Sequence, residues 1–153
     1  MKKWLLFLMM LSVSVAFGAS STNSPVGYWQ QIDDVTNRPH SVVKIWSTDN
    51  VLYGKVVKGY PDENGNMPNP LCVNCKGDLY NQPIRGMVIL SGFTQSDSGV
   101  WKNGQLLDPD SGKIYSCQIT LSDDGNKLNV RGYVGVSLFG RTQVWIRLKK
   151  FKE

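Results

Sequence analysis

The chain has 153 residues, of which 41% are hydrophobic and 19% are charged, and its formal net charge is +5. This length suits one domain of ordinary size rather than two. The composition excludes a disordered chain, a coiled coil and a polytopic membrane protein. Together with 15 glycines and 7 prolines, it is typical of a globular domain rich in β-strands and turns.

The first residues have the pattern of a secretory signal peptide. Two lysines precede an apolar run from Trp4 to Val15, and Ala16-Phe17-Gly18 supplies the small residues that signal peptidase recognises. The run is too short to cross a membrane as a helix, and no cysteine directly follows it to carry a lipid. We therefore expect residues 1–19 to be removed and residues 20–153 to form one domain. The product is expected to be periplasmic or secreted, without a transmembrane anchor.

The remaining charge is small and lies mainly at the C-terminus. Loss of Lys2 and Lys3 lowers the net charge from +5 to +3, and four of the remaining cations lie within residues 147–152. No basic stripe interleaved with aromatic residues occurs elsewhere, so we expect no nucleic-acid partner. We interpret the basic end as a solvated tail. An anionic surface such as phospholipid headgroups is the alternative.

Short segments rich in β-branched and aromatic residues follow one another along the chain. No window of eleven residues has a helical stripe. Turn signals such as Asp108-Pro109-Asp110-Ser111-Gly112 and Asp123-Asp124-Gly125-Asn126 separate the segments. Eight strands are predicted, at residues 26–32, 41–47, 51–59, 84–93, 99–107, 113–121, 127–136 and 141–149.

Eight antiparallel strands joined mainly by tight turns favour an all-β fold, a single up-and-down barrel. Closure removes the exposed edges that would otherwise pair with other chains. A β-sandwich is the alternative. Eight strands enclose an interior that side chains can just fill or that can hold one small ligand.

One long loop, residues 61–83, interrupts the pattern and contains Cys72 and Cys75. In an oxidising compartment we expect a disulfide. Cys117 lies on the strand face that we expect to be buried, which favours a Cys72–Cys75 bridge. Loop entropy favours a Cys75–Cys117 bridge instead, at about 4 against about 2 kcal/mol. A redox-active C-x-x-C pair and a zinc site completed by His40 are further alternatives.

No residue pattern in the sequence is typical of an active site. The chain has one histidine, His40, and no G-x-S-x-G motif, so a serine relay is not expected. We expect His40 to cap the turn at residues 37–39. The acidic pairs Asp33-Asp34 and Asp123-Asp124 adjoin turn signals, which indicates turn acids. We interpret the protein as not an enzyme, with no metal and no cofactor.

Aromatic residues and arginines mark both ends of the domain. Gly27-Tyr28-Trp29 opens the first strand and Trp145-Ile146-Arg147 closes the last. In a closed barrel these strands are neighbours, so Trp29 can plug one end while an arginine stacks on its indole ring. This arrangement resembles the calycin superfamily of lipocalins, fatty-acid-binding proteins and avidins, in which a G-x-W on the first strand meets a basic residue of the last.

A longer series of motifs resembles the bacterial domain-of-unknown-function family 2147, small exported proteins of calycin-like architecture. The matching stretches include Gly27-x-Trp29, residues 41–46 and 52–55, Cys72-x-x-Cys75, residues 107–117, residues 128–135 and residues 140–147. They cover essentially all of the chain that follows the predicted signal peptide. The resemblance implies the barrel fold and export, and it brings no established activity.

We expect the barrel to bind a small, largely apolar ligand such as a lipid or fatty acid. The candidate ligand residues are Trp29, Trp46, Arg131, Tyr133, Arg141 and Trp145. For Trp29 and Trp145 we favour a bracing role, and Gly27, Arg147 and Asp108 are candidate structural residues. Trp46 shares its strand face with Lys44, which indicates an outward position.

Arg131 and Arg141 are expected near a common rim of the barrel, with Asp108 as a counter-ion. If the ligand carries a carboxylate or phosphate, these arginines can hold it by bidentate hydrogen bonds. The alternative, which we favour, is that they brace turns through carbonyl groups and Asp108.

A second hypothesis is a packed barrel that acts as an interaction or stress-protective module. Its partner would be an envelope protein, bound through the loop at residues 61–83. Met67, Leu71 and Tyr80 are expected to be exposed there.

Overall fold

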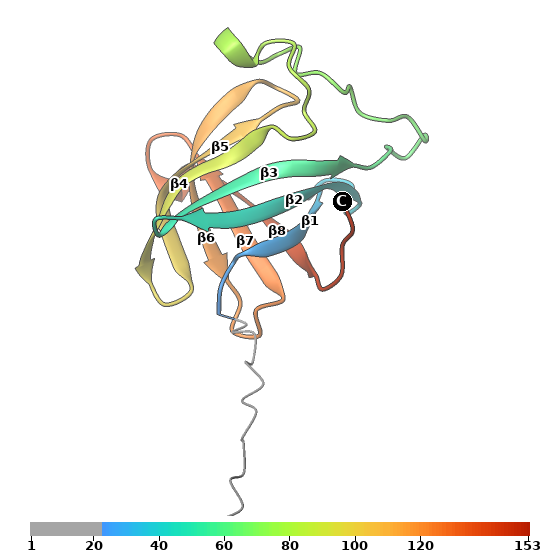
Figure 1. Ribbon diagram of the computed structural model, residues 1–153. Coiled ribbons are helices and arrows are strands. Elements are labelled where there is room, and N and C mark those ends of the chain that lie inside the picture. The colour runs from blue at the N-terminus through green and yellow to red at the C-terminus, as the bar shows by residue number, and fades with distance from the viewer. Residues whose placement is uncertain (1–22) are drawn as a thin grey trace, which may run out of the picture.

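Eight antiparallel strands close into a barrel in the computed structural model, which describes residues 23–153 (Figure 1). They are β1 (Gly27–Ile32), β2 (Pro39–Thr48), β3 (Val51–Gly59), β4 (Val88–Asp97), β5 (Val100–Asp108), β6 (Lys113–Leu121), β7 (Lys127–Tyr133) and β8 (Arg141–Leu148). Each strand pairs with the next, and β1 pairs with β8. The predicted up-and-down barrel is confirmed, and the β-sandwich is excluded. The predicted signal peptide, residues 1–19, lies outside the described residues.

The helical content is small. Two short 3-10 helices, η1 (Gly77–Leu79) and η2 (Ser137–Phe139), interrupt the connections after β3 and β7. Among residues 23–153, no helix is long and apolar enough to cross a membrane.

β4 and β7 differ most from their predicted ranges, and the other strands begin and end within two residues of theirs. β4 begins at Val88 rather than at residue 84, because the preceding residues turn: Met87 N–H donates to the Ile84 carbonyl at 3.0 Å, and Gly86 has a φ of 91°. β7 ends at Tyr133 rather than at residue 136, because Gly135 has a φ of 75° and the chain then enters η2. Residue types alone cannot predict these ends, which depend on where pairing with the neighbouring strand stops.

The barrel has two different ends. The hairpin turns after β2, β4 and β6 lie at one end, together with the start of β1 and the end of β8, which pair with each other. We call this the closed end. The β1–β2 and β5–β6 turns, the long loop at residues 60–87 and the β7–β8 connection lie at the other, which we call the open end. Figure 1 shows the long loop, in green, projecting from the open end.

Large side chains fill the closed end of the barrel interior. Trp29, Phe93 and Trp145 have no solvent exposure, and burying a side chain of this size contributes about 2–3 kcal/mol. Gly104 makes room for this packing, because a Cβ atom there would lie 2.4 Å from the ring of Phe93. Ile45, Leu90, Ile119 and Leu128 belong to the same core cluster.

Arg147 ties the closed end together. Its guanidinium carbon lies 4.3 Å from the centroid of the Trp29 ring. Its nitrogen atoms donate to the carbonyl oxygens of Ser24 (2.6 Å), Val26 (2.9 Å) and Gly125 (2.5 Å). Gly27 has a φ of 136°, and a Cβ there would approach Arg147 to 3.1 Å. The arginine therefore joins β8 to the segment before β1 and to the β6–β7 turn.

Replacing Arg147 with lysine should destabilise the barrel. Lysine keeps the charge but cannot reach three carbonyl oxygens with one planar fork, so the free energy of unfolding should fall by about 2 kcal/mol or more. Urea denaturation followed by tryptophan fluorescence measures this change. Arg38→Lys is the matched control, because Arg38 is exposed and its side chain has no hydrogen-bond partner among residues 23–153. Equal unfolding midpoints for the two variants would contradict the bracing role.

Candidate functional site

The open half of the barrel leads into a cavity of about 770 Å³, which residues 67–70 and 83–85 of the long loop and residues 151–153 also line. Its inward positions carry small or branched residues, such as Ser41, Val56, Val130 and Gly132, where the closed end carries indole rings. Pockets that bind small molecules in proteins have volumes of about 300–1,000 Å³. The interior is therefore packed at one end and hollow at the other.

The cavity has one apolar wall and one polar wall. The apolar wall consists of side chains from β3 to β7: Val56, Ile89, Leu106, Tyr115 and Val130. The polar wall consists of side chains from the neighbouring strands β8, β1 and β2: Gln143, Gln31 and Ser41, with Arg141 and His40 at its rim. A molecule held between these walls would meet hydrocarbon on one side and hydrogen-bonding groups on the other.

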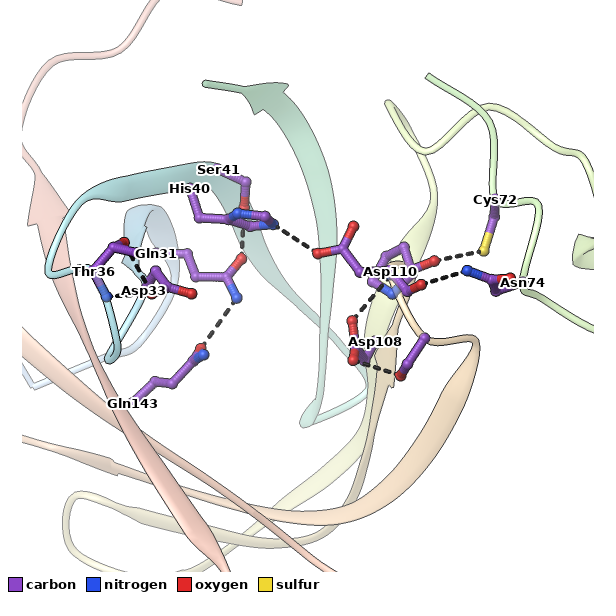
Figure 2. A network of polar contacts seen from close by, with 12 residues as sticks. Gln31, Asp33, Thr36, His40, Ser41, Cys72, Asn74, Asp108, Asp110 and Gln143 are labelled. Atoms are coloured by element: carbon purple, nitrogen blue, oxygen red, sulfur yellow. Dashed lines mark hydrogen bonds and ion pairs between the residues drawn. The ribbon is translucent and has the colours of Figure 1, made fainter. Parts of the chain in front are cut away.

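A directed chain of hydrogen bonds runs along the polar wall (Figure 2). Ser41 Oγ donates to Gln31 Oε1 at 2.7 Å, and Gln31 Nε2 donates to Gln143 Oε1 at 3.1 Å. Trp145 Nε1 donates to the same Gln143 oxygen at 3.1 Å. Because an indole N–H can only donate, the contact with Trp145 requires the Gln143 atom to be its carbonyl oxygen. The buried Trp145 therefore fixes the donor and acceptor at each step of this series of hydrogen bonds, from Ser41 through Gln31 to Gln143.

Arg141 stands at the rim beside this wall, and its counter-ion is not the predicted one. Both oxygens of Asp34 accept hydrogen bonds from its guanidinium, and these bonds hold the pKa of Asp34 below its usual value. Asp108 instead accepts from the Ser111 hydroxyl and the Asp110 N–H within its own turn. The expected Asp108 contact is therefore corrected: the β1–β2 turn lies next to β8 in the closed barrel, and Asp108 lies on the far side.

Arg131 holds the connection between β7 and β8. It donates to the carbonyl oxygens of Ser137 (2.8 Å) and Leu138 (3.3 Å) and to Thr142 Oγ1 (2.9 Å). Arg131 and Tyr133 alternate with the inward residues of β7 and do not line the cavity. Arg131 therefore lies on the outer face of the barrel, whereas the Arg141 side chain lies on the inner face.

The candidate tryptophans also lie away from the cavity. Trp29 and Trp145 are buried in the closed end, where the Trp29 N–H donates to the Pro25 carbonyl at 2.7 Å. Trp46 stacks on Tyr53, its cross-strand neighbour, with ring centroids 5.8 Å apart. Of the six candidate ligand residues, the structure brings only Arg141 to the cavity wall.

Gln31, Ser41 and Gln143 were not among the predicted site residues. A signal was present, because Gln31 follows the inward Trp29 by two positions and Gln143 precedes the inward Trp145 by two. Side chains alternate along a strand with a period of two, so each glutamine shares the inner face with its tryptophan. A polar residue at an inward position of a small barrel is a candidate for ligand contact.

His40 lies at the mouth of the cavity and contacts Asp110, with 3.3 Å between Nε2 and Oδ2 (Figure 2). The predicted cap on the turn at residues 37–39 is therefore wrong. The contact connects β2 with the β5–β6 turn, across the open end of the barrel. The hydrogen bond to Asp110 raises the pKa of His40, and the same bond lowers the pKa of Asp110.

The long loop folds back onto the rim of the barrel. The predicted Cys72–Cys75 disulfide is present, and both residues are buried. Asn74 Nδ2 donates to the Asp110 carbonyl at 2.6 Å, and a Cβ at Gly112 would lie 1.8 Å from the Asn74 carbonyl oxygen. The loop is thus docked against the β5–β6 turn, beside the cavity mouth.

The third cysteine is separate from the bridge. Cys117 is free and fully buried, and burial raises the pKa of its thiol to about 12. The Cys72–Cys75 bridge rules out the long bridge and the zinc site as alternatives in this structure. Among residues 23–153, no group of three or more His, Cys, Asp or Glu side chains is placed to hold a metal ion.

The loop is only partly exposed. Met67 and Tyr80 are exposed at 65% and 60%. Leu71 is half-buried and pairs with Pro83 through a β-bridge, which corrects the expectation that it is exposed.

Known proteins resemble this chain in sequence profile and in fold. The family described as "Uncharacterized protein conserved in bacteria (DUF2147)" matches residues 27–147. Among solved structures, the chain is similar to the protein HP1028 of Helicobacter pylori, which is described as belonging to the lipocalin family. The TM-score is 0.70 at 20% sequence identity, over 82% of this chain and 84% of that one. This similarity shows a shared fold. No curated protein matches the chain.

The His40–Asp110 pair should make stability depend on pH. The folded pKa of His40 is raised, so its contribution is fully present below about pH 6.5 and is lost as the pH rises through the folded value. Both side chains are more than one third exposed, so the effect should not exceed about 1 kcal/mol, or about 2–4 °C in melting temperature. Calorimetry of the wild type and of His40→Gln should give a difference near pH 6 that disappears near pH 9. A difference that is the same at both pH values would contradict this role of the pair.

Proposed function

We propose that this chain, which belongs to the DUF2147 family of uncharacterized bacterial proteins, binds one small, largely apolar ligand in the open half of its interior. Its lipocalin-like barrel fold supports the proposal. The observation that carries the proposal is the cavity itself. Five apolar side chains line one side of it, while the large buried side chains of Trp29, Phe93 and Trp145 occupy the closed end of the same barrel. A lipid is a ligand class of suitable size and polarity.

The proposed role is binding without catalysis. His40, the one histidine of the chain, is already paired with Asp110 at the rim, and no serine, threonine or cysteine side chain hydrogen-bonds to it among the described residues. A nucleophile and a base within hydrogen-bond reach are the signature of covalent catalysis. Their separation here supports a binding protein.

We also propose that the protein works outside the cytoplasm, in the periplasm or as a secreted protein. The pattern of residues 1–19 is that of a signal peptide. The Cys72–Cys75 bridge supports the same location, because disulfides persist in oxidising compartments.

A second candidate function is an interaction with an envelope protein through the open end. Met67 and Tyr80 of the long loop favour it, and so do Leu138 and Phe139 of η2, which are 78% and 79% exposed. Exposed apolar residues gathered at one end of a domain are typical of a contact surface. If the cavity takes up no ligand, these exposed side chains are where a partner protein would bind.

Filling the cavity from one side tests the first proposal. Gly132 lines the cavity, and a Cβ there would make ordinary contacts with Leu106 and Tyr115 at 3.5 Å and beyond. Gly132→Leu should therefore fold and occupy part of the cavity. The neutral dye N-phenylnaphthylamine, which fluoresces in apolar surroundings, should bind the wild type and lose affinity by about tenfold or more in this variant.

Gly132→Ala is the matched control, because it changes the same backbone position and leaves most of the volume free. Its dye affinity should stay within about twofold of the wild type. Failure of the dye to bind the wild type, or equal binding to Gly132→Leu, would refute the proposal that the barrel interior is the binding site.

A further inference from the structure

The polar wall of the cavity is uncharged and has unused hydrogen-bonding capacity. Each glutamine amide has two N–H donors, and Gln31 uses one of them on Gln143. The Ser41 hydroxyl donates to Gln31 and keeps its acceptor lone pairs, although the residue is only 5% exposed. Donors and acceptors are thus both available to a ligand at one place on the wall.

The cation nearest to this wall is already neutralised. Arg141 gives its planar fork to both oxygens of Asp34, which is the arrangement it would need to hold a ligand carboxylate. An incoming carboxylate would have to displace Asp34 and leave that side chain without its partner. Such a displacement gains little, because it exchanges one ion pair for another.

The other charged groups at the cavity rim do not supply a free cation to the polar wall. Asp33, Asp108 and Asp110 border the cavity and would repel an anion. His40 is paired with Asp110, and Lys58 lies over the ring of Tyr60, with its nitrogen 4.7 Å from the centroid. Arg85 is exposed in the long loop, and the exposed Lys152 lies between Phe151 and Glu153, which contact Tyr28 on the outer face of β1, whereas the polar wall is on the inner face.

We infer that the ligand is an amphiphile whose polar group is uncharged, such as a hydroxyl or a primary amide, and that free fatty acid anions are selected against. This inference rests on the proposed function and refines it. The apolar body would lie against Val56, Ile89 and Val130, and the polar group would bond to Gln31, Ser41 and Gln143.

A series of ligands with one chain length and different polar groups tests the inference in the wild-type protein. Decanamide, decanol and decanoate are each titrated against bound N-phenylnaphthylamine at about pH 7.5, where the carboxylate is ionised. The amide and the alcohol should displace the dye with dissociation constants about tenfold or more below that of decanoate. Equal or tighter binding of decanoate would overturn the inference and leave the proposed function standing. Failure of the dye to bind at all would refute the proposed function instead.

The variant Asp34→Asn tests the cause of the selectivity. It frees the Arg141 guanidinium, so the affinity for decanoate should rise about tenfold while that for decanamide stays within about twofold. Asp97→Asn is the matched control, because it removes one carboxylate from the closed end, where that group has no hydrogen-bond partner among residues 23–153. Unchanged decanoate affinity in folded Asp34→Asn would overturn the inference. If this variant does not fold, the displacement series in the wild-type protein tests the inference on its own.

Discussion

The packing of two indole rings into one end of the barrel is the constraint on which the rest of the structure depends. An eight-stranded barrel is only just wide enough for side chains to fill it, so the sizes of the inward residues decide where space remains. Trp29 and Trp145 occupy the closed end, and Arg147 covers Trp29 and bonds to three carbonyl groups around it. This leaves the open end, where the inward residues are smaller, free to contain a cavity.

The same indoles organise the polar side of the cavity. The Trp145 N–H needs an acceptor because it is buried, and Gln143 supplies it. That contact orients the Gln143 amide and, through it, Gln31 and Ser41. No buried side-chain nitrogen or oxygen atom of the described residues lacks a hydrogen-bond partner. The polar wall is therefore compatible with a stable fold, and a ligand is not needed to satisfy it.

Much of the fold could be predicted from the sequence, because it depends on local patterns. The alternation of Tyr115, Cys117 and Ile119 and the turn residues between segments predict the strand order and closure. The inward position of Cys117 favours the short Cys72–Cys75 bridge, which is present, although loop entropy alone favours a bridge to Cys117. Much of the candidate site depends instead on pairs that are distant along the chain. Arg141 meets Asp34 across 107 positions, and a β-bulge between Gln31 and Ile32 shifts the register beside the cavity. Neither can be read from local periodicity, so Asp108 was an incorrect choice of partner and the two glutamines were not recognised.

The central claim is that the open half of the barrel holds a small neutral amphiphile. Native mass spectrometry of the protein purified from its own host, without detergent, tests this claim most directly. We predict a complex of one chain with one small molecule, which organic solvent releases and which carries hydroxyl or amide groups on an apolar body. A spectrum that contains only the bare polypeptide, or a complex with a fatty acid anion, would contradict it.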